Sequence, residues 1–190
     1  MISLHIFTEE ESAKRLFDIL ISRLFPELNF RVYPHQGKQD LKEALTKTLP
    51  VISKKPGSRI LVTIDQDSGD CILIKNSILT MVSTHCQCPV KIRIICRELE
   101  SWFLGDLDSI KKVYPRFNPI FYKNKRTYRN VDLIHNPDKH LLKAIPELKN
   151  KNYFPKVEFA EKLAPLMNYD NNTSISFKNT LKGINSLLES

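Results

Sequence analysis

Residues 59–67 read Arg-Ile-Leu-Val-Thr-Ile-Asp-Gln-Asp, so that a short apolar run ends directly in two carboxylates. Such a run, rich in β-branched residues, predicts a buried parallel strand. Two other runs share this pattern: Ile2–Phe7 precedes Glu9-Glu10-Glu11, and Val90–Cys96 precedes Glu98-Leu99-Glu100. Ligands of open α/β sheets bind outside the carboxyl ends of the strands, and like charges gathered there are costly unless a cation or proton lies between them. The sequence therefore predicts a divalent-metal site.

The segments between the apolar runs have helical spacing, which predicts an α/β fold with a mostly parallel, Rossmann-like sheet of about four strands. We expect strands over Ser3–Thr8, Phe30–Tyr33, Arg59–Ile64 and Val90–Cys96, and helices over Glu10–Phe25, Asp40–Leu49, Asp70–Thr84 and Glu98–Leu104. Prolines become frequent after Gly105, which predicts an α/β core over residues 1–106 and a helical, irregular C-terminal extension over 107–190. Within this extension, helices are expected over Lys156–Leu166 and Ser174–Leu188.

The 190-residue chain carries a net charge of +8, a balance suited to nucleic acid or another polyanion, although a generally basic surface is an alternative. Neither a signal peptide nor a membrane span is expected. The segment His85-Cys86-Gln87-Cys88 could supply zinc ligands, but no second pair of Cys or His residues follows at zinc-finger spacing, which argues against structural zinc. We expect reduced thiols and a cytoplasmic location.

Asp65 and Asp67 alternate on an extended segment, so both can address one Mg²⁺ or Mn²⁺ ion. The competing interpretation is a solvated turn, in which Asp is common. Glu9 is nearest to its strand end and is expected to be a metal ligand or the general base. Glu10 and Glu11 are explained by the dipole of the following helix.

Glu98 and Glu100 are candidate ligands for a second ion, with a solvated helix start as the alternative. Lys38 and His35, beside Gly37, are candidate phosphate contacts, although the full phosphate-loop pattern is absent. Residues 109–131 hold seven basic residues, no acid and several aromatics, a combination that favours nucleic acid, or else an exposed loop anchored by its aromatics. The candidates there are Lys123, Lys125, Arg126 and Arg129.

Strand-Glu followed by strand-Asp-x-Asp resembles the TOPRIM domain of topoisomerases, primases and OLD-type nucleases. The chain is also similar to a narrower bacterial TOPRIM-like family of unknown function, related to RloB-type proteins. The segments that carry this second resemblance are 8–12, 35–41, 64–67, 97–106, 159–163 and 174–177. It implies Mg²⁺ at Glu9, Asp65 and Asp67, an AAA-type ATPase encoded nearby, and a role in phage defence. One departure is Glu10, where TOPRIM domains usually have Gly.

Three functions remain open from the sequence. The first is a Mg²⁺-dependent nuclease or other phosphoryl-transfer enzyme acting on DNA or RNA. The second is a catalytically silent module that binds nucleic acid or a partner ATPase. The third is a small-molecule phosphotransferase or phosphatase, which a deep closed pocket over Asp65 would favour and an open basic groove would not.

Overall fold

The computed structural model describes all residues from Met1 to Ser190 and contains one parallel sheet in the order β2-β1-β3-β4. The strands are β1 (Ser3–Thr8), β2 (Asn29–Pro34), β3 (Ser58–Asp65) and β4 (Val90–Ile95). β1 and β3 are central and almost entirely buried, as their continuous apolar runs predicted. The predicted α/β class and four-stranded parallel sheet are confirmed.

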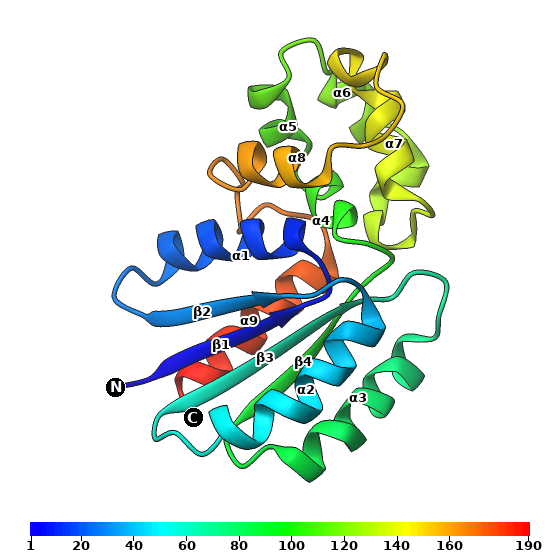
Figure 1. Ribbon diagram of the computed structural model, residues 1–190. Coiled ribbons are helices and arrows are strands. Elements are labelled where there is room, and N and C mark those ends of the chain that lie inside the picture. Colours follow the sequence, from blue (N-terminus) through cyan, green and yellow to red (C-terminus); the bar gives the residue numbers. More distant parts are fainter.

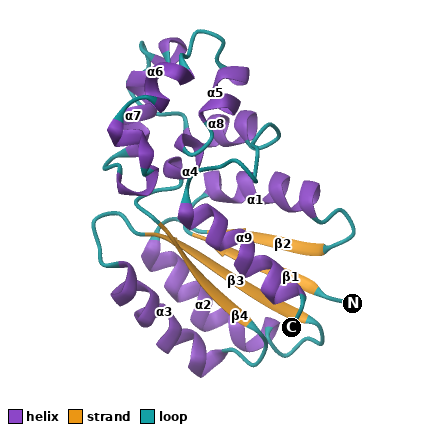
Figure 2. Cartoon of the chain, turned by 180° about the vertical axis from the view of Figure 1, so that it is seen from behind, coloured by secondary structure: helices purple, strands orange, loops and turns teal.

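Helices cover both faces of the sheet (Figure 1). α1 (Glu11–Leu24) and α9 (Ile175–Leu188) lie on one face, and α2 (Lys38–Ile52) and α3 (Cys71–His85) lie on the other. Each face has its own apolar cluster, and the larger one continues from α1 into the helices beyond the sheet. The view from behind shows α9 crossing the sheet beside β4 (Figure 2).

Short helices stand over the carboxyl ends of the strands (Figure 1). We call residues 107–163 the helical cap. Following α4 (Glu100–Leu104), the cap contains α5 (Leu107–Val113), α6 (Pro119–Lys123), α7 (Pro137–Ala144), α8 (Lys156–Leu163) and the 3₁₀ turns Arg126–Arg129, Val131–Leu133 and Pro146–Leu148. The chain then returns to the sheet as α9, so the last helix packs with the α/β layers. The division at residue 106 stays a prediction.

Element boundaries differ from expectation by a few residues. α2 begins at Lys38 and continues past Pro50 to Ile52, whereas α4 begins only at Glu100. The α3 start is fixed by Asp70, whose carboxylate accepts hydrogen bonds from the Ile72 and Leu73 amides at 2.8 and 2.9 Å. No helix is long and apolar enough to cross a membrane.

Candidate active site

Acidic residues from three strand ends meet beneath the helical cap. Glu9 follows β1, Asp65 is the last residue of β3, and Glu100 begins α4 after β4. A Glu9 carboxylate oxygen accepts a hydrogen bond from the Asp65 amide at 3.1 Å. Glu9 and Asp65, 56 residues apart in sequence, are therefore in contact at this end of the sheet, through a backbone amide and not between their two carboxyl groups.

Two of these carboxyl groups are buried. Asp65 is 6% exposed and Glu100 is 0% exposed. Burial, followed by the charges of Glu100, Glu10 and Glu9, raises the pKa of Asp65 well above its ordinary value. Burial also raises the pKa of Glu100 to about 8, and neither of its oxygens has a hydrogen-bond partner. We call Glu9, Glu10, Asp65 and Glu100 the acidic cluster.

A lysine from the cap supplies positive charge to this cluster. The Lys156 ammonium, at the start of α8, lies 3.2 and 3.4 Å from the two Glu10 oxygens and 3.8 Å from a Glu100 oxygen. Burial lowers the pKa of Lys156, but Glu100 and Glu10 outweigh that effect and raise it. Sequence reasoning missed Lys156 because no local pattern links it to strand ends so far away in the chain.

Glu10 also has a different role from the one expected. It occupies the N-cap position of α1, yet its side chain makes no capping hydrogen bond and instead pairs with Lys156. Glu98 is half-buried, and its side chain forms no hydrogen bond or ion pair. Burial, followed by the charge of Asp138, raises the pKa of Glu98.

Asp67 lies on a strained loop beside the cluster. Its φ is +53°, and that of Arg97, on the neighbouring loop, is +61°. The Asp67 amide donates to the Arg97 carbonyl at 2.7 Å, and the Arg97 guanidinium donates back to the Asp67 carbonyl at 3.2 Å. Left-handed backbone costs about 1–3 kcal/mol at a non-glycine residue, and such strain gathers at functional sites.

Hydrogen bonds hold the turn between β2 and α2 against the same end of the sheet. The Gly37 amide donates to the Glu9 carbonyl at 3.0 Å, and His35 Nδ1 donates to the Thr8 carbonyl at 2.8 Å. Gly37 has φ +95°, a conformation that favours glycine. This turn brings the Lys38 ammonium to 2.5 Å from an Asp67 carboxylate oxygen. Lys38 is thus beside the acids, whereas the His35 ring holds two loops together.

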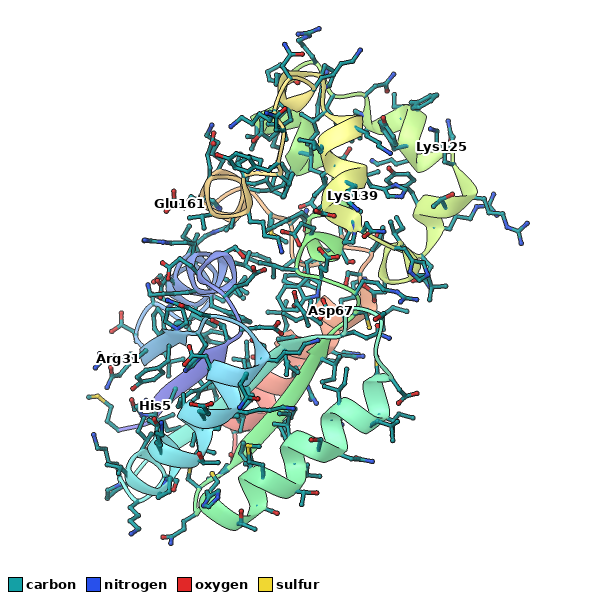
Figure 3. All side chains as sticks on the ribbon, turned by 45° about the vertical axis from the view of Figure 1, so that its right-hand side comes forward. His5, Arg31, Asp67, Lys125, Lys139 and Glu161 are labelled. Carbon is teal, nitrogen blue, oxygen red and sulfur yellow. The ribbon has the colours of Figure 1, made fainter.

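The basic candidates of the cap lie apart from the acidic cluster. Lys123 pairs with Asp108 at 2.6 Å, and the Lys125 ammonium lies over the Phe121 ring at 4.0 Å from its centroid. Figure 3 shows Lys125 on the outer part of the cap and Asp67 at the junction between cap and sheet. None of Lys123, Lys125, Arg126 and Arg129 forms a hydrogen bond or ion pair with the cluster.

The acidic cluster has the oxygen ligands that a divalent cation prefers, but its side chains are not arranged as a complete metal-binding site. Carboxylate oxygens are the ligands that Mg²⁺ and Mn²⁺ prefer, and the unpartnered Glu100 oxygens are buried acceptors that a cation would satisfy. As placed, no three His, Cys, Asp or Glu side chains form a group that could hold a metal ion. Binding a divalent ion therefore requires these carboxylates to rotate toward a common point.

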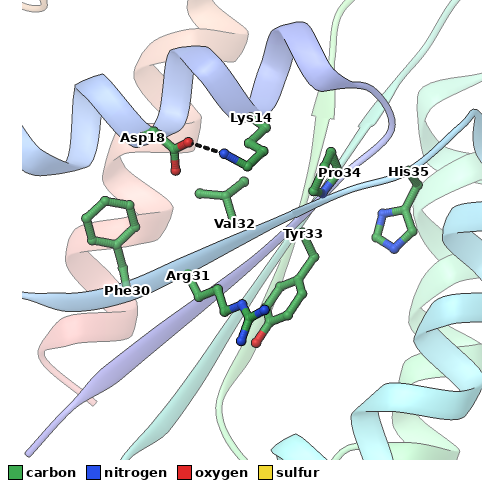
Figure 4. A pocket seen from close by; sticks show the side chains of 8 residues that line it. All are labelled: Lys14, Asp18, Phe30, Arg31, Val32, Tyr33, Pro34 and His35. Atoms are coloured by element: carbon green, nitrogen blue, oxygen red, sulfur yellow. Dashed lines mark hydrogen bonds and ion pairs between the residues drawn. The ribbon is translucent and has the colours of Figure 1, made fainter.

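None of the five main cavities is lined by a member of the acidic cluster. A hollow of about 570 Å³ lies instead at the β2 edge, where Lys14 and Asp18 of α1 face residues 30–35 (Figure 4). Another, of about 480 Å³, lies in the cap and includes Lys123 and Arg129. The buried acids of the cluster therefore border none of these cavities.

Comparisons with known proteins agree with this architecture. A family model described as "Domain of unknown function (DUF4276)" matches residues 8–185. No curated protein matches the chain. Among solved structures, the C-terminal region of the Burkholderia pseudomallei OLD protein is similar, with a TM-score of 0.60 and 16% identity over 97% of this chain and 98% of that one. At this identity the likeness concerns the fold.

Proposed function

Since this chain belongs to the DUF4276 family of domains of unknown function, its activity has to be inferred from its own side chains, and we propose that it is a divalent-metal-dependent nuclease. One observation carries the proposal: at the end of the sheet where Glu9 and Asp65 also lie, the Glu100 carboxyl is fully buried without a hydrogen-bond partner. Burying a carboxyl group without a hydrogen-bond partner costs free energy, and a group of this kind with a strongly shifted pKa is a candidate for a functional site.

We assign the metal-binding role to Glu9, Asp65 and Asp67, with Glu98 and Glu100 as ligands for a second ion. When bound, a divalent ion stabilises negative charge on phosphate oxygens and lowers the pKa of a water molecule. The raised pKa of Glu9, due first to burial, suits it to accept a proton from that water.

Two lysines supply positive charge at the site, one to the substrate and one to the acids. Lys38 lies at the rim of the site and pairs with Asp67. Its ammonium group could leave Asp67 and bind a phosphate oxygen by a movement of the lysine side chain alone. Lys156 lies deeper, among Glu10 and Glu100, and balances charge inside the cluster. The basic residues of the outer cap, Lys123 to Arg129, would contact the backbone of a nucleic acid that extends beyond the cluster.

None of the five main cavities contains a member of the acidic cluster, which supports a polymeric substrate over a small phosphorylated molecule, because small-molecule sites are usually concave and enclosed. A silent binding module remains the second candidate. It is favoured by the present pairing of Lys38 with Asp67 and of Lys156 with Glu10, which neutralises carboxylates without any metal. The TOPRIM resemblance adds the proposal that an AAA-type ATPase partner, in phage defence, controls cleavage.

The test combines metal binding with cleavage of labelled single- and double-stranded DNA and RNA. We expect Mn²⁺ binding by the wild type, an affinity about 10- to 100-fold lower for Asp65→Asn, and cleavage lost with that variant or with chelator. Glu27→Gln, an exposed carboxyl outside the site, is the matched control. Cleavage that persists in Asp65→Asn would refute the assignment, and metal-independent nucleic-acid binding without cleavage would favour the silent module.

A further inference from the structure

A groove runs along the exposed edge of β4, and nothing in the proposed nuclease function uses it. The groove has a volume of about 770 Å³ and is lined by residues of α3, β4 and α9. We call it the β4-edge groove. Its lining is mixed, and 7 of its 15 residues are hydrophobic. The larger apolar side chains are Ile72 and Leu79 of α3, Ile92 and Ile94 of β4, and Ile175 of α9.

The α3 side of the groove is unusually apolar for a surface helix. Ile72 is 68% exposed and Leu79 is 47% exposed, while Ile78 and Val82 of the same helix are buried against the sheet. An amphipathic surface helix normally has one apolar stripe, and a helix that is apolar on several sides is normally covered. Ile175, at the start of α9, is 59% exposed across the groove.

The floor of the groove offers backbone hydrogen-bonding groups. The carbonyls of Pro89 and Ile95 accept from the Ile60 and Gln66 amides on the β3 side, at 3.0 and 2.9 Å. Because successive residues of a strand point their polar groups to alternate sides, the amides and carbonyls of Ile92 and Ile94 point away from β3. The Ile92 carbonyl accepts a long hydrogen bond of 3.4 Å from the Arg93 guanidinium, which an added strand would have to displace. β4 is the last strand of the sheet, so this edge can accept an additional strand.

The charges around the groove select among possible occupants. Lys75, Arg93 and Lys182 line it, and neither lysine has an ion-pair partner. The single acid in the lining, Asp132, is buried and accepts hydrogen bonds from Ser174 and Ser176. A second copy of this chain is disfavoured as the occupant, because a two-fold axis would bring these like charges together. Nucleic acid is disfavoured because the groove has no aromatic side chain on which bases could stack.

We propose that the β4-edge groove binds an extended, acidic segment of a partner protein, which adds a strand to β4. Apolar side chains of the segment contact Ile72 and Leu79, and its carboxylates face Lys75 and Lys182. This inference is independent of the nuclease proposal, because the groove contains no residue of the acidic cluster.

A fluorescent peptide that alternates valine with glutamate tests the proposal by anisotropy. We expect binding that weakens at least about tenfold in the double variant Lys75→Glu/Lys182→Glu and in Leu79→Ser. Leu73→Ser is the matched control, since Leu73 is 70% exposed on the same helix but does not line the groove. A peptide that alternates valine with lysine should not bind, because its positive charge would be repelled by Lys75 and Lys182. A valine–glutamate peptide interrupted by prolines should not bind either, because proline has no amide hydrogen to donate to β4.

Three outcomes would overturn the proposal. The first is equal binding of all three peptides, or no binding of the valine–glutamate peptide. The second is a dimer in solution, seen by light scattering, that dissociates in Leu79→Ser and not in Leu73→Ser, because a second copy would then occupy the groove. The third is single-stranded DNA whose binding is lost in Lys75→Glu/Lys182→Glu, which would make the groove a nucleic-acid site.

Discussion

Replacing Glu100 by Gln tests whether the buried carboxyl at the centre of the acidic cluster destabilises the folded chain when it is charged. Glutamine has nearly the same size and keeps the packing, but it cannot ionise. Glu100 is 0% exposed, neither of its oxygens has a hydrogen-bond partner, and its pKa is raised to about 8 from an ordinary 4.5. Folding therefore favours the protonated form of this side chain.

The sign and size of the effect follow from these two pKa values. Below pH 4.5 the carboxyl is protonated in both folded and unfolded chains, so it causes no loss of stability. As the pH rises from 4.5 to 8, only the unfolded chain releases the proton, and the free energy of unfolding falls. The difference between 4.5 and about 8, at 1.36 kcal/mol per pKa unit, corresponds to on the order of 5 kcal/mol.

Urea unfolding followed by tryptophan fluorescence measures this effect, since Trp102 is the single tryptophan and is fully buried. In chelator, we expect wild type and Glu100→Gln to be similar at pH 4.5, and the variant to be more stable by several kcal/mol at pH 8.5. Glu27→Gln should follow the wild type at both values. A stability difference between wild type and Glu100→Gln that does not change with pH would refute the reasoning.

Three further changes have defined outcomes. Trp102→Phe removes volume and the indole hydrogen bond to Ser176, which measures 2.8 Å, and we expect a loss of about 3 kcal/mol by urea unfolding followed by circular dichroism, since this variant has no tryptophan. Gly105→Ala should cost at least about 1–3 kcal/mol, because the new methyl group overlaps the buried Asn172 side chain; an unchanged melting temperature would contradict this. Lys156→Met leaves two carboxylates without their cation, so it should destabilise the chain more at pH 9 than at pH 6, and equal loss at both would count against the pairing.

The sheet was predictable because its two central strands are continuous apolar runs that end in polar residues. The positions of Glu9 and Asp65 followed from the same pattern, since parallel strands deliver their carboxyl ends to one edge. The irregular cap was much less accessible to prediction. Its helices are short, and α5, α6 and α7 are positioned by packing around aromatic residues such as Phe117 and Phe159, which leaves little periodicity to detect.

The features of the site that could not be predicted from the sequence are those that depend on tertiary contacts. Glu10 has a sufficient local explanation as a helix-dipole acid, and only its pairing with Lys156 shows that it belongs to the cluster. The left-handed backbone of Asp67 and Arg97 likewise has no signal in residue type, because neither position is glycine. The groove beside β4 could not be predicted, because it is formed by residues of α3, β4 and α9 that meet only in the folded chain.

The position of Lys156 couples two parts of the molecule. This side chain belongs to α8, whereas the carboxylates it neutralises belong to the sheet end, so the spacing between cap and sheet sets the net charge of the cluster. A displacement of α8 by a few ångströms would withdraw one positive charge from a poorly solvated pair of acids and strengthen their attraction for any other cation. If a divalent ion binds the cluster as proposed, its binding and a displacement of α8 would each change the equilibrium of the other.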